Sequence, residues 1–173
     1  AIKIQNPDNR TYVGGYGPSV APDWYADKVD GVVVGEGEKA WYDVVASQGR
    51  ELGIIFRPAI TTLDEIPFTD RDFIKVERSI DVAKREEGRR VTGILGNRGC
   101  LRRCKFCADG SPKTIYGTKL RERSPDNIVD EMEQVLERYD IEFFKFADPE
   151  VNTRPGRIRE LSACLIRRKW QTP

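Results

Sequence analysis

The chain contains no histidine and only four cysteines among its 173 residues. Histidine is the usual fourth ligand of a cysteine-rich zinc site, so its absence removes the commonest way to complete one. Four cysteines, three of them clustered, do not form a disulfide framework and favour a reducing compartment, so we expect a cytoplasmic protein. No apolar run approaches the roughly 18 residues that a membrane span needs, and no signal peptide is visible. An apolar fraction of 39% with 33% charged residues is typical of a soluble, globular protein.

Charge is unevenly distributed along the chain. The segment 84–123 holds 12 basic and 4 acidic residues, a balance of +8, whereas the rest of the chain carries −7. Such a segment is either a solvated basic surface or a site of attraction for an anionic partner, such as RNA or an acidic electron donor. Basic charge without base-stacking aromatics is weak evidence for a nucleic-acid partner.

Three cysteines form a C-x3-C-x2-C pattern at Cys100, Cys104 and Cys107. Thiolates are soft ligands that suit iron–sulfur clusters, zinc or cuprous copper, and three of them in one short loop can converge on one centre. The remaining Cys164 lies in a predicted helix beside an apolar stripe, where we expect a buried, inert thiol. Three ligands would leave one iron of a 4Fe-4S cluster open, like the open position of a catalytic metal site.

The cysteine pattern and its flanks resemble the radical S-adenosylmethionine (SAM) superfamily. The shared features are the apolar strand at 91–95, the aromatic Phe106 directly before the third cysteine, and the Arg-Glu-Arg-Ser run at 121–124. The resemblance implies that the three cysteines hold a 4Fe-4S cluster whose open iron chelates SAM, and that reductive cleavage of SAM yields a deoxyadenosyl radical. It also implies that Phe106 contacts SAM.

A second SAM contact is implied by the same resemblance. Residues 141–147 are predicted to form a strand, and Asp148 and Glu150 follow its carboxyl end, at the same mouth as the cysteines. The family commonly uses polar residues there to hold the SAM ammonium group, which implies this role for Asp148 and Glu150. A carboxylate that only caps the loop is the alternative.

Two glycine loops mark the first part of the chain. One follows a short strand at 11–13 and the other a β-branched strand at 30–34, and each leads into a predicted helix. Repeated strand, glycine loop and helix are typical of a doubly wound α/β sheet. The dinucleotide fingerprint G-x-G-x-x-G fails, because Val20 stands at the third glycine position.

The order of these two units resembles the second half of a cobalamin-binding domain, which many radical SAM enzymes carry before the cysteine motif. The resemblance implies that the paired glycines and the loop after the next strand line a cobalamin site. These residues are Gly14, Gly15, Gly35 and Glu36. The family's cobalt-ligating histidine loop would lie upstream of this chain. A plain α/β scaffold is the alternative.

The predicted fold class is therefore α/β. We expect the C-terminal half of a doubly wound, Rossmann-like cobalamin-binding domain over residues 1–48, a linker over 49–90, and the start of a radical SAM partial (β/α) barrel over 91–173. A complete β/α barrel takes about 250 residues. The chain is thus expected to be a fragment that is inactive on its own.

The predicted function is that of a radical SAM enzyme with a 4Fe-4S cluster, SAM and cobalamin, which performs methyl transfer or related radical chemistry on a small-molecule substrate. The expected protein partner is a reductant such as flavodoxin or ferredoxin. Two alternatives remain open. One is an RNA-modifying radical SAM methylthiotransferase, for which the basic segment is the only hint, and the other is a non-catalytic iron–sulfur or zinc-binding module.

Overall fold

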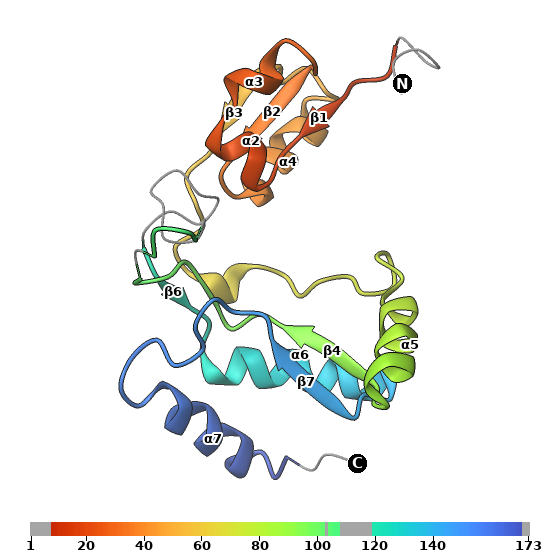
Figure 1. Cartoon of the computed structure of the whole chain (residues 1–173), viewed down its shortest axis with the longest axis vertical. Coiled ribbons are helices and arrows are strands. Elements are labelled where there is room, and N and C mark those ends of the chain that lie inside the picture. The colour runs from red at the N-terminus through yellow and green to blue at the C-terminus, as the bar shows by residue number, and fades with distance from the viewer. Residues whose placement is uncertain (1–7, 103, 108–118, 171–173) are drawn as a thin grey trace. The chain divides into compact units, whose positions relative to one another are not determined.

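A computed structural model describes residues 8–102, 104–107 and 119–170 (Figure 1). It divides them into two compact units. The first contains the described residues of 1–59 and 99–119, and the second those of 60–98 and 120–173. No helix within these described residues is long and apolar enough to cross a membrane.

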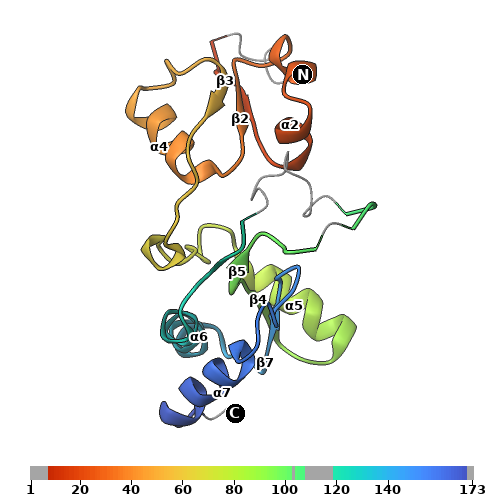
Figure 2. The same cartoon turned by 90° about the vertical axis from the view of Figure 1, so that its left-hand side faces the viewer.

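A three-stranded parallel sheet forms the centre of the first unit. Its strands, in spatial order, are β1 (Tyr12–Val13), β2 (Gly31–Val34) and β3 (Gly53–Phe56). Its helices are α2 (Tyr16–Val20), α3 (Asp23–Ala26) and α4 (Gly37–Ala46). Figure 2 shows α4 on one side of the sheet and α2 on the other. Val32 and Val33 are buried because both faces of β2 are covered, which explains its uninterrupted β-branched sequence.

The first sheet extends beyond residue 48, the predicted end of the first domain. β3 pairs with β2 over four residues, with Ile54 opposite Val32 and Phe56 opposite Val34. Ile55 is buried against α4, in a cluster with Val33. The segment that follows α4 therefore completes this sheet and is not a free connector.

The second unit is built on two parallel strands, β4 (Val91–Ile94) and β7 (Phe143–Phe146). Two helices, α6 (Pro125–Tyr139) and α7 (Arg157–Arg167), pack on the face that carries Ile94. The shared core comprises Ile94, Ile128, Val129, Met132, Leu161 and Cys164. The order strand, helix, strand, helix confirms the α/β fold class.

The start of α6 agrees with its sequence. The Ser124 hydroxyl accepts a hydrogen bond from the Asn127 amide at 3.1 Å, and Pro125 occupies the first helical position. Ile128 and Met132 are buried, as their helical spacing predicts. The start of α6 lies directly after the segment that carries the cysteines, so it fixes the position of the C-terminal end of that segment.

The predicted linker, residues 49–90, contributes a helix to the second unit. α5 (Val76–Glu87) buries Val76 and Ile80. Both side chains pack against the C-terminal part of α6 and the start of the following segment, at Val135, Tyr139 and Ile141. The second core therefore begins before residue 91.

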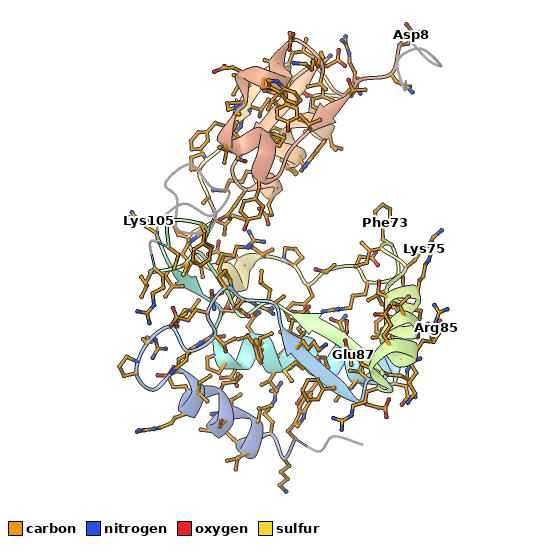
Figure 3. All side chains as sticks on the ribbon, in the orientation of Figure 1. Asp8, Phe73, Lys75, Arg85, Glu87 and Lys105 are labelled. Atoms are coloured by element: carbon orange, nitrogen blue, oxygen red, sulfur yellow. The ribbon has the colours of Figure 1, made fainter. Side chains whose placement is uncertain are left out.

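The rest of the connector covers the start of α6. A short 3-10 helix, η1 (Leu63–Glu65), carries Asp64, whose carboxylate accepts a hydrogen bond from the Ser124 amide at 2.9 Å. Further along, Phe73 is 85% exposed and points away from the second unit (Figure 3). The connector is therefore held to α6 at Asp64 and exposes its side chain to solvent at Phe73.

Candidate functional site

Two short strands join the ends of the segment that carries the cysteines. β5 (Asn97–Arg98) and β6 (Arg121–Glu122) pair in antiparallel fashion. β5 follows β4 closely, so the segment leaves from the carboxyl end of a parallel strand, where α/β folds place their ligand-binding loops. We call residues 99–120 the cysteine loop and the β5–β6 pair its base.

The three clustered cysteines differ in exposure. Cys104 is exposed, whereas Cys100 and Cys107 are partly exposed. The Arg102 amide donates to the Cys100 sulfur at 3.4 Å, and the Cys107 amide donates to the Cys104 carbonyl at 3.1 Å. Over the described ranges, no three histidine, cysteine, aspartate or glutamate side chains are arranged to hold a metal ion. Cluster binding therefore stays a prediction from donor type and spacing.

Cys164 lies where its sequence neighbourhood predicts. It is 1% exposed in α7, and its Sγ lies 3.4 Å from Oδ1 of Asp126 in α6. Burial, followed by the neighbouring Asp126 carboxylate, raises the pKa of the Cys164 thiol. The burial of Cys164 is thus confirmed; because a protonated, buried thiol is a poor metal ligand, its absence from the ligand set stays a prediction.

Phe106 stands out in the cysteine loop with a side chain that is 94% exposed. Its neighbour Lys105 is also exposed and points outward (Figure 3). The aromatic ring is accessible to a ligand, and its predicted contact with SAM stays a prediction.

Asp148 contacts the start of the cysteine-loop base. Its two carboxylate oxygens accept hydrogen bonds from the Gly96 amide at 2.9 and 3.0 Å, and the Asn97 amide also donates to Oδ1. Burial raises the pKa of Asp148, and these amide donors offset part of the rise. The geometry is that of a loop-capping carboxylate, and its role toward SAM stays a prediction.

Glu150 reaches the same place through its backbone. Its carbonyl accepts a hydrogen bond from Nδ2 of Asn97 at 2.8 Å, and Asn97 is 2% exposed. Asp148 and Glu150 therefore both lie at the entrance of the cysteine loop, as their position after β7 predicts. The predicted contact of Glu150 with SAM is likewise untested by this geometry.

Two charged residues at this base escape prediction from the sequence. Arg157 is 4% exposed and donates to the Arg123 carbonyl at 2.8 Å. Glu122 in β6 accepts from the Thr153 hydroxyl and from Nε of Arg154, the latter at 2.9 Å. The sequence offers one signal that could have identified Glu122 and Arg157: charged residues lie directly beside the cysteine loop and at the start of α7.

The two glycine loops of the first unit lie next to each other. The Gly35 amide donates to the hydroxyl of Ser19, a buried residue of α2, at 3.0 Å. Gly15 and Gly35 adopt φ values of 98° and 86°, which favour glycine. Glu36 is 5% exposed and precedes the first residue of α4. The structure thus brings Gly15, Gly35 and Glu36 to the carboxyl edge of the parallel sheet.

The glycines of the first loop differ in the space around them. A Cβ atom on Gly14 would lie 3.5 Å from the Cβ of Val33, in ordinary contact, whereas one on Gly15 would find no heavy atom within 4 Å. Gly14 therefore packs against β2, and Gly15 borders open space. A ligand could approach the backbone at Gly15 without displacing side chains.

Some basic residues of the segment 84–123 pair with acids that lie outside it. Lys84 bonds to Glu142 at 3.0 Å, and Arg90 bonds to Glu77 at 2.8 Å. These pairs lie in the second unit and reduce the positive charge that is free to attract an anion. These paired residues therefore do not support the alternative of an RNA-modifying enzyme.

A cavity of about 280 Å³ lies in the second unit beside the ends of β4 and β7. Its lining includes Leu63, Pro67, Phe68, Leu95, Arg123 and Ala147. The guanidinium of Arg123 lies 5.4 Å from the ring centre of Phe68. Glu131, a buried residue that also lines the cavity, bonds to Arg123 at 2.5 Å and to Arg71 at 2.8 Å. The connector therefore closes one side of a mostly apolar cavity over a buried ion triad.

Comparison with known proteins agrees with this arrangement. The Radical SAM superfamily profile matches residues 94–172. Cytidylyl-2-hydroxyethylphosphonate methyltransferase from Streptomyces wedmorensis is 29% identical, over 64% of this chain and 21% of that protein. The anaerobic magnesium-protoporphyrin IX monomethyl ester cyclase from Rubrivivax gelatinosus is 28% identical, over 96% and 33%. Bacteriochlorophyllide d C-12(1)-methyltransferase from Chlorobaculum tepidum is 27% identical, over 86% and 32%.

Solved structures share the fold. The radical S-adenosylmethionine methyltransferase TsrM from Kitasatospora setae is known with tryptophan and the SAM analogue aza-SAM, and with cobalamin and a 4Fe-4S cluster. Each structure matches with a TM-score of 0.63 at 21% identity, over 94% of this chain and 34% of that chain. The chain therefore spans about a fifth to a third of the length of the proteins it matches.

Proposed function

We propose that this chain, whose residues 94–172 match the Radical SAM superfamily profile, belongs to an enzyme that binds a 4Fe-4S cluster through Cys100, Cys104 and Cys107 and cleaves SAM reductively. The observation that carries the proposal is the position of the three cysteines in the loop that directly follows β4 and β5. The donor set fits the group: three soft sulfur ligands, each at least partly exposed, and no histidine to complete a zinc site.

The chain's own residues would hold the cofactors and orient them. When bound, such a cluster supplies the electron that breaks a carbon–sulfur bond of SAM. The Arg102 amide donates to the Cys100 sulfur and would stabilise its negative charge as a ligand. Phe106 offers an exposed aromatic ring to SAM.

We assign the SAM ammonium to Asp148, with Glu150 beside it. A carboxylate has about four acceptor positions, and the Gly96 and Asn97 amides use only part of them. The remaining capacity can accept from an ammonium group while the backbone amides hold the carboxylate in place. A capping contact and a ligand contact are therefore compatible on this one side chain.

We propose cobalamin as a further cofactor, held by the first unit. The support is the adjacency of the two glycine loops, the open space at Gly15, and the likeness in fold to a methyltransferase solved with cobalamin. The lining residues would be Gly14, Gly15, Gly35 and Glu36. The chain has no histidine, so it supplies no imidazole to the cobalt.

The proposed reaction is methyl transfer or a related radical reaction on a small-molecule substrate. The relatives include two methyltransferases and a cyclase, and they do not single out one substrate for this chain. A low-potential protein such as flavodoxin or ferredoxin would supply the electron.

The test is anaerobic reconstitution of the complete protein with iron and sulfide, followed by reduction with dithionite in the presence of SAM. We expect about four irons per chain, as the 4Fe-4S cluster requires, and release of methionine and 5′-deoxyadenosine. The Cys104→Ala variant is the control, and it should neither take up the four irons nor release methionine and 5′-deoxyadenosine. An intact cluster that leaves SAM unchanged, or zinc in place of iron, contradicts the proposal.

A further inference from the structure

Arg157 is buried where a positive charge is costly. It is 4% exposed and occupies the first position of α7, where the positive end of the helix dipole disfavours a cation. Its ion-pair partner among the described residues, Glu122, lies 3.9 Å away, measured from Nε to Oε1. A buried charge needs hydrogen-bond partners to be tolerated, so the contacts of Arg157 indicate why it is there.

These contacts lie at the two ends of the cysteine loop. Nη2 of Arg157 donates to the Arg123 carbonyl at 2.8 Å and, over a longer distance of 3.4 Å, to the Gly96 carbonyl. Gly96 directly precedes β5, and Arg123 directly follows β6. The Arg123 amide also donates to the Gly96 carbonyl at 2.9 Å. One guanidinium group therefore sits on the junction where the loop leaves the fold and returns to it.

Glu122 makes a second connection, to the loop between β7 and α7. The Thr153 hydroxyl and Nε of Arg154 donate to its carboxylate. The same β7–α7 loop contains Asp148, which accepts from the Gly96 and Asn97 amides. We call these residues the loop-base network: Gly96, Asn97, Glu122, Asp148, Thr153, Arg154 and Arg157.

We propose that Glu122 and Arg157 are positioning residues that fix the β7–α7 loop relative to the base of the cysteine loop. This inference rests on the proposed function, in which the first of these loops contacts SAM and the second carries the cluster. Neither side chain needs to touch SAM or iron, because Arg157 acts through the carbonyls of Gly96 and Arg123, and Glu122 acts through the side chains of Thr153 and Arg154. Their effect is on the alignment of the two loops.

The geometry of arginine is essential to this role. A planar guanidinium addresses two carbonyls in fixed directions, whereas a lysine ammonium is a compact charge on a flexible stem. Arg157→Lys therefore keeps the charge and removes the two-point contact. Glu122→Gln keeps the shape of the side chain but replaces one acceptor oxygen by a donor, so the side chain loses its charge and can accept from only one of Thr153 and Arg154 at its former positions.

The experiment compares these two variants with a matched control in the complete, anaerobically reconstituted protein. The control is Glu142→Gln, which removes a carboxylate from the other end of the β4–β7 pair, where Glu142 accepts from the Arg90 amide at 2.6 Å and from Lys84 at 3.0 Å. Four quantities are measured: iron content, thermal midpoint, SAM affinity by equilibrium dialysis, and the change in the electron paramagnetic resonance spectrum of the reduced cluster when SAM is added.

We expect full iron content in all three variants. Arg157→Lys and Glu122→Gln should bind SAM about tenfold more weakly, the size usual for residues that orient a ligand-binding group, and should show a smaller SAM-dependent spectral change. The control should match the wild type in both readouts, whatever its thermal midpoint. A purely structural role would lower the midpoint and leave SAM affinity and the spectral change of the folded protein intact.

Wild-type SAM affinity and spectra in both variants would overturn the inference, and so would an equal loss in the Glu142→Gln control. If Arg157→Lys does not fold, Glu122→Gln decides alone. A wild-type protein that takes up iron but does not bind SAM contradicts the proposed function instead, so the two failures are distinguishable.

Discussion

The Sγ atom of Cys164 lies 3.4 Å from Oδ1 of Asp126, inside the contact between α7 and α6. The fourth cysteine is thus part of a helix interface, and the other three are in the cysteine loop. Cys164→Ala should leave the iron content unchanged and lower the free energy of unfolding by about 1 kcal/mol, as for the loss of a small buried group. Iron analysis and urea unfolding measure the two effects. Loss of iron in this variant would show that Cys164 is a ligand.

The opposite result is expected for the cysteine loop. Alanine at any one of Cys100, Cys104 and Cys107 should abolish cluster assembly. The segment offers three thiolate ligands, and the proposed cluster needs all of them. Absorbance near 400 nm and iron content after reconstitution are the measurements. A variant of these three that keeps a full cluster would remove that cysteine from the ligand set.

Glu131 is predicted to be important for stability. Its side chain is 7% exposed and bonds to Arg71 and Arg123, which are 10% and 11% exposed. Glu131→Gln leaves two arginines without a counter-charge and should cost about 3–5 kcal/mol. The control is Glu133→Gln on the same helix, where an exposed pair with Arg168 is worth less than about 1 kcal/mol. Equal effects in urea unfolding would contradict the triad's role.

Gly15 and Gly53 provide a matched test of cobalamin binding. Both have positive φ, 98° and 76°, and a Cβ at either would meet no heavy atom within 4 Å. Gly15 also has ψ −166°, a combination essentially restricted to glycine, so alanine there should cost more backbone strain than the roughly 1–2 kcal/mol expected at Gly53, and binding is compared on folded protein. Only Gly15→Ala should weaken hydroxocobalamin binding by about tenfold, because an added methyl group would intrude on the ligand. Equal affinity of both variants in equilibrium dialysis argues against the proposed cobalamin site.

Glu122 should make stability depend on pH. Burial is the largest influence and raises its pKa, but hydrogen bonds from Thr153 and Arg154 and the charge of Arg157 together hold the pKa below the ordinary 4.5. Because the folded pKa is the lower one, the stabilisation is complete above pH 4.5 and is lost as pH falls through the folded value. The difference in unfolding free energy between wild type and Glu122→Gln should shrink in that acidic range. A difference that is constant with pH contradicts the assignment.

Local patterns predicted the elements that depend on local chemistry. The start of α6 follows from a serine cap and a proline at the next position, and the buried strand β2 follows from three consecutive valines. The cysteine loop follows from spacing alone. These features need no knowledge of distant parts of the chain, which is why the sequence suffices for them.

Contacts between distant segments were not predictable in the same way. Helical spacing predicts that α7 buries Ile158 with Leu161, but Ile158 is 43% exposed and Arg157 is buried. The buried face of α7 runs through Arg157, Leu161 and Cys164, and the Arg157 guanidinium donates to two backbone carbonyls that lie more than 30 residues away in the sequence. Likewise, helical spacing places Trp41 and Val45 on the same side of α4 as the buried Val44, but they are 42% and 74% exposed. Hydrophobic periodicity alone does not reveal which distant polar groups will form hydrogen bonds with a helix.

The β5–β6 pair has a consequence for assembly of the metal site. Joining the ends of a segment of about two dozen residues costs entropy that rises with the logarithm of its length. Strand pairing and the contacts from the β7–α7 loop offset this entropy when the polypeptide folds, before iron is bound. The three thiols are then confined to a closed loop at high effective concentration, so insertion of the proposed cluster would need no further closure of the loop. Chelation of the iron should accordingly leave the junction at residues 96–98 and 121–123 in place, and the emptied protein ready to be refilled.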